Sequence, residues 1–263
     1  MKDQILSYQK SAHEKVTILD KKRRPLVSVI VPTLNEEKYI EKCLKAIRNQ
    51  SYRNYELIIS DGDSDDKTIE IAKKYADKIV ISKKRGFAAQ HNNGAKVSSG
   101  KILVFVRADN IVAEDLLEEA VRFVNNGYVC GGCKVIPDEP YKASYNIFYS
   151  IISFLNVITS KMKINIAFIG DVFFFDKKAF SKISGFKEVA GSEDVDIIIR
   201  IRNIGRIGWT GKTYTINSSR RFKKEGFFVT VMRWIIGCLW VLIKKPLKQR
   251  YKYGYHTHLK TVY

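Results

Sequence analysis

Short apolar runs alternate with longer amphipathic stretches over the first half of the chain. Val27–Val31, Tyr55–Ser60 and Ile102–Val106 are rich in apolar residues, and each is followed by polar or turn-forming residues. Runs of this kind are typical of strands that are covered on both faces in a parallel sheet. We therefore predict three central strands here, with a short fourth strand over Ile79–Ser82.

The stretches between these runs have the spacing of helices. Apolar residues recur every three or four positions after the first strand, and helical patterns over Thr68–Tyr75 and Ala88–Val97 separate the later strands. Strands that alternate with helices in this way predict an α/β fold with a mostly parallel, Rossmann-like central sheet. The apolar positions of the first helix are Ile40, Cys43, Leu44 and Ile47.

The second half of the chain is less regular. We predict strands over Val129–Val135 and Ile169–Phe175 and a short helix over Phe180–Phe186. A further helix begins at Ser192, a residue type that caps helices, with acidic residues in its first turn. Tyr141–Ile158 is aromatic and aliphatic but is interrupted by Ser and Asn, and its pattern leaves its structure open.

The end of the chain combines an apolar stretch with cations. Phe227–Ile243 has 17 residues, of which only Arg233 is charged. As a helix it would be about 26 Å long, shorter than a hydrocarbon core of ~30 Å. We expect this amphipathic helical tail to lie in a membrane surface rather than to span it, whereas a core helix or an oligomer contact remains open. Residues suited to the interface are Trp234, Trp240, Lys244, Lys245, Arg250 and Tyr251.

The charge of the chain indicates an anionic partner. It has 46 Lys and Arg against 27 Asp and Glu, a formal net charge of +19, and its 45% hydrophobic content excludes a disordered chain. It shows no zinc-finger spacing and no aromatic RNA-binding strand, so we predict phosphates and an anionic membrane surface as partners, and no nucleic acid. Residues 1–25 form a basic arm without the apolar stretch of a secretion signal, from which we expect a cytoplasmic start.

Cys130-Gly-Gly-Cys133 has the spacing of a redox pair or of half a zinc site. No second pair follows to complete four ligands, so we predict reduced thiols. A lone carboxylate, Asp109, follows the strand Ile102–Val106 and is placed to bind a divalent cation, although capping of a helix would also explain it. His91 is expected on a helix surface.

Five segments in a particular order carry a family resemblance. They are Ser28–Glu37, Ile59–Asp66, Arg85–Ala95, Val104–Asp109 and Ser192–Asp194. With them, the chain resembles the family 2 glycosyltransferases of GT-A fold over residues 27–225. The resemblance implies an inverting transferase that uses a nucleotide sugar, with a UDP- or GDP-linked donor favoured, and Mn²⁺ or Mg²⁺.

The resemblance also implies roles for individual residues. Asp109 would ligate the metal, and Asp194 would be the catalytic base with Glu193 beside it, although Asp196 remains an alternative base. Independently of the resemblance, the segment Ser218–Phe222 offers Arg220 and Arg221 as a clamp for the diphosphate, or else forms a basic surface turn. Residues expected to bind the nucleotide are Pro32, Thr33, Glu36, Asp61, Asp63, Arg85 and Arg107.

Two departures from the family pattern concern the donor site. Arg107-Ala-Asp109 stands where relatives commonly have Asp-x-Asp, so Asp109 would hold the metal with phosphates and water, or Arg107 would supply part of the positive charge. Asp61-Gly-Asp63 stands where many relatives have Asp-Asp-Gly.

The predicted organisation is an arm (1–25), a nucleotide-sugar-binding half (26–130), an acceptor and catalytic half of the same domain (131–225) and a membrane-associated tail (226–263). The acceptor would be a lipid-linked molecule or a cell-envelope glycan, at the cytoplasmic face of the membrane, with the protein peripheral or monotopic. Two alternatives remain. The first is a polyprenyl-phosphate glycosyl synthase, which needs no base. The second is a catalytically silent scaffold that binds nucleotide or membrane.

Overall fold

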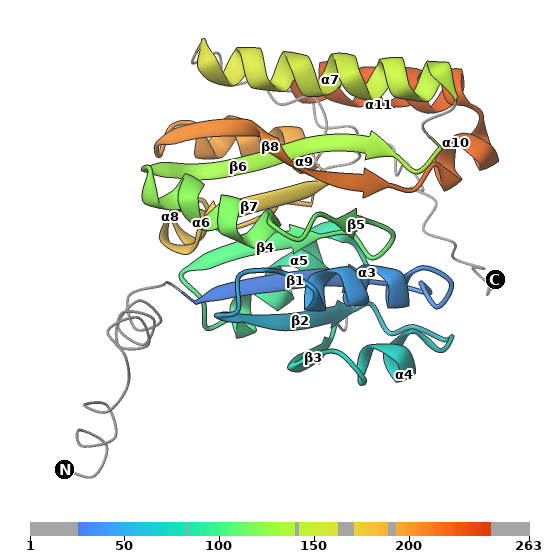
Figure 1. The fold of residues 1–263 in the computed structure, drawn as a ribbon, viewed down its shortest axis with the longest axis vertical. Coiled ribbons are helices and arrows are strands. Elements are labelled where there is room, and N and C mark those ends of the chain that lie inside the picture. The colour runs from blue at the N-terminus through green and yellow to red at the C-terminus, as the bar shows by residue number, and fades with distance from the viewer. Residues whose placement is uncertain (1–25, 83, 140–141, 163–170, 189–192, 243–263) are drawn as a thin grey trace, which may run out of the picture.

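A computed structural model describes residues 26–82, 84–139, 142–162, 171–188 and 193–242 of the chain (Figure 1). Its centre is an eight-stranded sheet with the order β3-β2-β1-β4-β7-β6-β8-β5. The strands are β1 (Val27–Thr33), β2 (Tyr55–Asp61), β3 (Lys78–Ile81), β4 (Ile102–Val106), β5 (Ile111–Val112), β6 (Tyr128–Pro137), β7 (Val172–Asp176) and β8 (Arg206–Asn217).

Strands β1 to β4 form the parallel part of the sheet, as the sequence predicts. β1 lies between β2 and β4, and β3 pairs with β2, all in parallel. Helices α3 (Ile40–Arg48), α4 (Thr68–Ala72) and α5 (Phe87–Val97) connect them. The predicted α/β fold is therefore confirmed.

Alternate residues of β1 enter two different cores. Val27, Val29 and Val31 pack in the core that contains α3, whereas Ile30 packs in the core that contains α5. Because successive side chains of a strand point to opposite faces, helices on both sides cover the sheet. This is the reason that four of the first five residues of the strand are apolar; the remaining one, Ser28, donates a hydrogen bond to Glu56.

The second half of the sheet is mixed. β7 runs antiparallel to both β4 and β6, whereas β6 and β8 are parallel, and β5 pairs antiparallel with β8. α8 (Lys177–Lys182) starts earlier than predicted because the Asp176 side chain caps it by accepting a hydrogen bond from the amide of Ala179. The boundary proposed between residues 130 and 131 falls inside β6. The remaining helices are α6 (Leu116–Asn125), α7 (Ala143–Lys161), α9 (Glu193–Ile201), α10 (Arg220–Glu225) and α11 (Phe227–Leu242).

Packing explains the Cys-Gly-Gly-Cys segment in β6. Cys130 and Cys133 are buried free thiols, and burial raises the pKa of both. A Cβ atom at Gly131 would collide with the Phe174 ring, and one at Gly132 with the Trp209 ring. The two glycines therefore let aromatic rings approach the strand, and both cysteines lie buried beside them as free thiols.

His91 is buried, contrary to the sequence-based expectation. Its ring stacks on Phe87 at 3.8 Å between centroids and also lies against Phe105 and Phe186. Burial lowers the pKa of His91 to about 3, so the ring is neutral and belongs to the core.

Helices α7 and α11 form a layer beside β6 and β8, at the end of the molecule remote from β3 (Figure 1). α7 occupies the stretch that the sequence left open, and α11 fills the tail helix predicted from residue 227 onward. The N-terminal arm over residues 1–25 and the cationic residues after α11 lie outside the described residues.

Candidate active site

The candidate site lies where the carboxyl ends of β1, β2 and β4 meet. Thr33 ends β1 and pairs in register with Asp61, which ends β2. Asp109 follows β4 on the other side of β1. Ligands bind at such strand ends in open α/β sheets.

The acidic loop after β2 is held by hydrogen bonds within the chain. Asp61 is buried, and one carboxylate oxygen accepts hydrogen bonds from the hydroxyls of Thr33 (2.6 Å) and Ser64 (2.7 Å). Arg85 donates to the carbonyls of Gly62 (3.0 Å) and Asp63 (2.8 Å). These residues thus shape the loop, and Pro32 lies in β1 beside Thr33.

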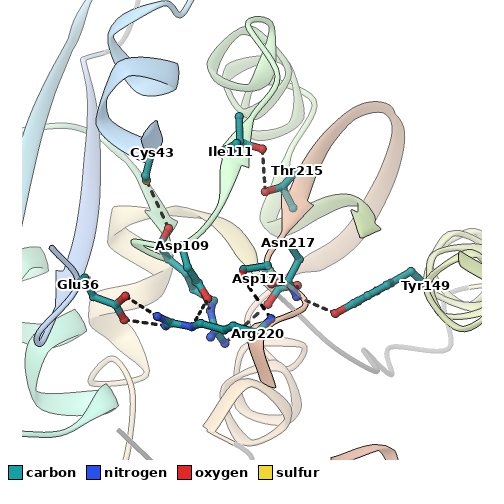
Figure 2. A network of polar contacts seen from close by, with 11 residues as sticks. Glu36, Cys43, Asp109, Ile111, Tyr149, Asp171, Thr215, Asn217 and Arg220 are labelled. Carbon is teal, nitrogen blue, oxygen red and sulfur yellow. Dashed lines mark hydrogen bonds and ion pairs between the residues drawn. The ribbon is translucent and has the colours of Figure 1, made fainter. Parts of the chain in front are cut away.

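Two guanidinium groups and two carboxylates form a network at the end of β4 (Figure 2). Arg220 donates two hydrogen bonds to Glu36, at 2.6 and 2.7 Å, and its Nε lies 3.0 Å from Oδ2 of Asp109. The Nε of Arg107 lies 3.2 Å from Oδ1 of Asp109. Both oxygens of Asp109, whose side chain is only 2% exposed, are therefore paired with arginines.

Three buried polar residues extend this network toward α7. Nη1 of Arg107 lies 3.8 Å from Oδ1 of Asp171. The amide of Asn217 donates to Asp171 at 2.7 Å and contacts the Tyr149 hydroxyl at 2.9 Å (Figure 2). None of these three residues is among the site residues predicted from the sequence.

A signal for Asp171 is nevertheless present in the sequence. Asp171 directly precedes the apolar run of β7, and β7 is antiparallel to β4, with Val172 opposite Val106. The start of β7 therefore lies at the same edge as the end of β4. A lone carboxylate before an antiparallel strand is equivalent in position to one after a parallel strand.

The network shifts the pKa values of its carboxyl groups in opposite directions. Burial alone would raise the pKa of Asp109, but the charges of Arg107 and Arg220 outweigh it and hold that pKa below its usual value. For Glu36 burial prevails over Arg220, and the pKa is raised. Burial also raises the pKa of Asp171 to about 6. Asp109 is thus ionised at neutral pH.

Helix α9 places the predicted catalytic carboxylates near this network. Burial and the neighbouring charge of Asp194 raise the pKa of Glu193 to about 7, while Arg221 and Arg107 oppose the shift. The charge of Asp194 also acts on buried Asp171. Asp196 instead forms an ion pair with Arg200 at 2.7 Å within the helix. Of the two candidate bases, Asp194 is therefore the one coupled to the network.

The donor set at Asp109 fits a cation that takes most of its ligands from elsewhere. Mg²⁺ commonly binds through one or two carboxylates together with substrate phosphates and water, and Asp109 supplies one ionised carboxylate. Within the described residues, no group of three or more His, Cys, Asp or Glu side chains is arranged to hold a metal. A cation at Asp109 would have to displace a guanidinium group from one of its oxygens.

The comparison with known sequences identifies the family. The pattern that defines Glycosyl transferase family 2 matches residues 28–184, more than half of the chain. The chain belongs to this family. It is a glycosyltransferase, as its resemblance predicts, and its acidic loop and Asp109 lie at the strand ends described above.

Curated relatives are similar over different shares of this glycosyltransferase. A Methanococcus voltae protein named dolichyl N-acetyl-alpha-D-glucosaminyl phosphate 3-beta-D-2,3-diacetamido-2,3-dideoxy-beta-D-glucuronosyltransferase is 27% identical over 250 residues, covering 87% of this chain and 71% of that protein. A Campylobacter jejuni GalNAc(5)-diNAcBac-PP-undecaprenol beta-1,3-glucosyltransferase is 33% identical over 120 residues, covering 42% and 39%. The chain spans less than half the length of several such relatives.

Solved structures share the fold. The mannosyltransferase PcManGT from Pyrobaculum calidifontis, in complex with GDP-Man and Mn²⁺, superposes with a TM-score of 0.68 at 23% identity, covering 89% of this chain and 73% of that one. S. aureus TarS in complex with UDP-GlcNAc gives 0.56 at 20% identity, covering 72% and 57%. These likenesses confirm the predicted GT-A fold.

Proposed function

We propose that this family 2 glycosyltransferase transfers a sugar from a nucleoside diphosphate sugar to a lipid-linked or cell-envelope acceptor with inversion. The observation that carries the proposal is the network at the end of β4. There an ionised carboxylate, Asp109, lies between two arginines. The relatives named for dolichyl and undecaprenol substrates support the choice of acceptor.

In this proposal the nucleotide occupies the ends of β1 and β2. Pro32, Thr33, Asp61 and Asp63 lie in β1 or in the acidic loop that Arg85 braces. Glu36 would turn toward the ribose or base once the donor competes for its partner Arg220. The structures with GDP-Man and UDP-GlcNAc support a donor of this class.

The diphosphate would lie near Arg107, Arg220 and Arg221. Guanidinium groups bind phosphate oxygens in bidentate geometry, so these residues can hold the leaving group as its negative charge grows. Mn²⁺ or Mg²⁺ held by Asp109 would neutralise more of that charge when bound. The Mn²⁺ complex of PcManGT supports this cofactor.

Asp194 would accept the proton of the attacking acceptor hydroxyl. The neighbouring Glu193 would influence the protonation of Asp194 through its own charge. The acceptor oxygen would form its bond to the anomeric carbon on the face opposite the diphosphate, while the bond from that carbon to the diphosphate breaks, which inverts the configuration; the carboxylate takes up the acceptor's proton. If the acceptor were a polyprenyl phosphate, its oxygen would already be anionic, and Asp194 would only position it.

The first test is calorimetric titration with UDP, GDP, CDP and dTDP, with and without Mn²⁺, on the wild type and Asp109→Asn. Tight binding of one nucleotide that requires Asp109 supports the donor site. Failure of all four favours the silent scaffold.

A second test addresses the acceptor. Asp194→Asn should reduce transfer to a hydroxyl acceptor at least 100-fold while donor binding persists. Normal turnover on a phosphorylated lipid with the same variant would identify the polyprenyl-phosphate synthase instead.

A further inference from the structure

Helix α7 carries large apolar side chains on its exposed face as well as on its buried face. Its buried positions include Ser153 and Asn156, both at most 8% exposed. Its outward positions carry large apolar side chains, and no charged residue occurs from position 143 to 160. A surface helix normally turns its charged face to water. The outward apolar residues, at positions i, i+4 and i+7, are Ile147, Ile151 and Phe154.

Helix α11 repeats this arrangement. Thr230 is buried, whereas Phe228 is 81% exposed. The single charge, Arg233, forms an ion pair with Glu225 at 2.6 Å. At 16 residues, α11 would be about 24 Å long, and no helix in the described residues is long and apolar enough to cross a membrane. Its exposed apolar residues are Phe228, Val229, Met232, Ile235, Ile236 and Leu239.

The two helices lie side by side and form one layer (Figure 1). The Phe148 ring of α7 stacks on Trp234 of α11 at 5.9 Å and meets Phe227 edge-on at 5.8 Å. Nine of the fifteen exposed large apolar side chains in the described residues lie on α7 or α11. We call these nine, the outward residues named above for each helix, the apolar layer. So much exposed apolar surface on one layer is a sign of a partner.

The positive charge of the chain favours an acidic bilayer over a second copy of the chain as the partner of the apolar layer. After α11 the sequence from 243 to 263 holds six Lys and Arg and no Asp or Glu, in a chain of net charge +19. A second copy of the chain would bring equal positive charge to the contact and be repelled. A bilayer with acidic headgroups instead offers an apolar interior next to negative charge, which suits helices lying in the interface.

We propose that α7 and α11 together form a lipid-binding surface that seats the protein on an acidic bilayer. The inference rests on the proposed function for its purpose, since it brings the active site to a membrane-bound acceptor. The sequence pointed only to the tail helix, whereas α7 supplies the second half of this surface.

The surface is joined directly to the active site. α10 begins with Arg220, in the strand-end network, and its Phe222 packs between Tyr145 of α7 and Phe227 of α11. From α7, the Tyr149 hydroxyl reaches Asn217 and through it Asp171. The bilayer would therefore lie on the side of the site that faces α7, where a lipid-linked acceptor would enter.

The test is flotation of the full chain with vesicles of phosphatidylcholine alone and of phosphatidylcholine mixed with phosphatidylglycerol. We expect binding to the acidic vesicles only. The double variant Ile151→Asn/Phe154→Asn on α7 should weaken it at least tenfold. Ile81→Asn changes an equally apolar, 46% exposed residue on β3, outside the apolar layer, and should have no effect. Asparagine is used because it adds no charge that the lipid would repel.

Two results would overturn the proposal. One is vesicle binding that survives the double variant unchanged, which would assign binding to the tail alone. The other is absence of vesicle binding together with a dimer, seen in sedimentation velocity, that the double variant dissociates. UDP and GDP titration of the same variants separates this proposal from the proposed function. If the wild type bound none of UDP, GDP, CDP and dTDP, the transferase site would be refuted and the vesicle result would stand.

Discussion

The strand-end network and the apolar layer of α7 and α11 depart from the usual distribution of residues in opposite ways. The network buries charged groups, such as Asp109, whereas the layer exposes large apolar groups, such as Phe154. Burying a charge and exposing a large apolar side chain both lower stability unless something compensates. In the network the compensation comes from within the chain, because each carboxylate meets a guanidinium group. In the layer, nothing within the described residues covers the apolar residues.

This difference separates two kinds of function. A network that is satisfied internally has to exchange partners when a ligand binds, so a donor diphosphate competes with Asp109 and Glu36 for Arg220. The apolar layer, by contrast, can bind a partner without breaking any contact within the described residues. We therefore expect the donor site to discriminate between nucleotides. We expect the apolar layer to bind many lipids, with an affinity that depends mainly on its apolar area and on the charge of the lipid.

The largest expected effect is that of Asp109→Asn. It removes the negative charge between Arg107 and Arg220, and breaking a buried ion pair costs about 3 kcal/mol of the free energy of unfolding. Transfer should fall at least 100-fold, since a site that stabilises developing charge loses a central group. Urea unfolding and a sugar-release assay measure the two effects.

The same variant, Asp109→Asn, tests whether the strand-end network and the apolar layer act separately, because it should bind acidic vesicles as the wild type does. Glu70→Gln serves as the matched control, since Glu70 is an exposed carboxylate on α4. Vesicle binding that fell together with transfer would show that the two regions are not separable.

The next largest effect concerns the link between the two regions. Phe222 is 3% exposed and contacts Tyr145, Phe227 and Trp234. Phe222→Ala should lower the free energy of unfolding by about 3 kcal/mol through cavity formation. It should also weaken donor and vesicle binding together, since it loosens α10 from both helices. Phe222→Leu fills most of the space and should restore both; a variant that lost only stability would disprove the link.

The free energy of unfolding should depend on pH because a carboxyl group, that of Asp171, is buried in the network. The pKa of Asp171 is raised to about 6 by burial, so between its unfolded value and that pH the folded state binds more protons than the unfolded state. Stability should therefore fall as pH rises from about 4 to 6, by at most about 3 kcal/mol for a shift of two pH units. Urea unfolding at several pH values measures the slope, which Asp171→Asn should flatten. An unchanged slope in that variant would place the ionisable group elsewhere.

The first half of the fold follows from the sequence because each local signal agrees with the tertiary structure. In β1, apolar residues enter both cores, so the run Val27–Val31 is recognised as a strand without knowledge of its neighbours. Asp109 was likewise predicted at the strand end. The structure puts it there, but its pairing with Arg220, more than a hundred residues later in the chain, depends on tertiary packing.

The second half resists prediction for a physical reason. α7 buries Ser153 and Asn156 together with Tyr149 and exposes Ile151, so its sequence does not separate an apolar face from a polar one. β8 buries Thr210, Thr213 and Thr215, so it lacks the run of apolar residues that would mark a core strand. Asp171 was overlooked because its significance arises only once β7 is known to be antiparallel to β4.

The smallest effect concerns a local departure from the family pattern. Asp63 has a φ of +66°, a left-handed conformation that glycine adopts without strain, and relatives with Asp-Asp-Gly carry glycine at this position. Gly62, one residue earlier, lies where a Cβ atom would come within 2.9 Å of the Gln90 amide nitrogen, so the glycine cannot simply be moved. Asp63→Gly should relieve backbone strain of about 1 kcal/mol in the folded state. Part of this gain is offset because glycine raises the conformational entropy of the unfolded chain. A net gain of about 0.5 kcal/mol in thermal unfolding is expected, whereas Gly62→Ala should destabilise the loop. If Asp63→Gly also left nucleotide binding unchanged, the Asp63 side chain would have no part in the donor site, and the loop would act through Asp61 and the backbone alone.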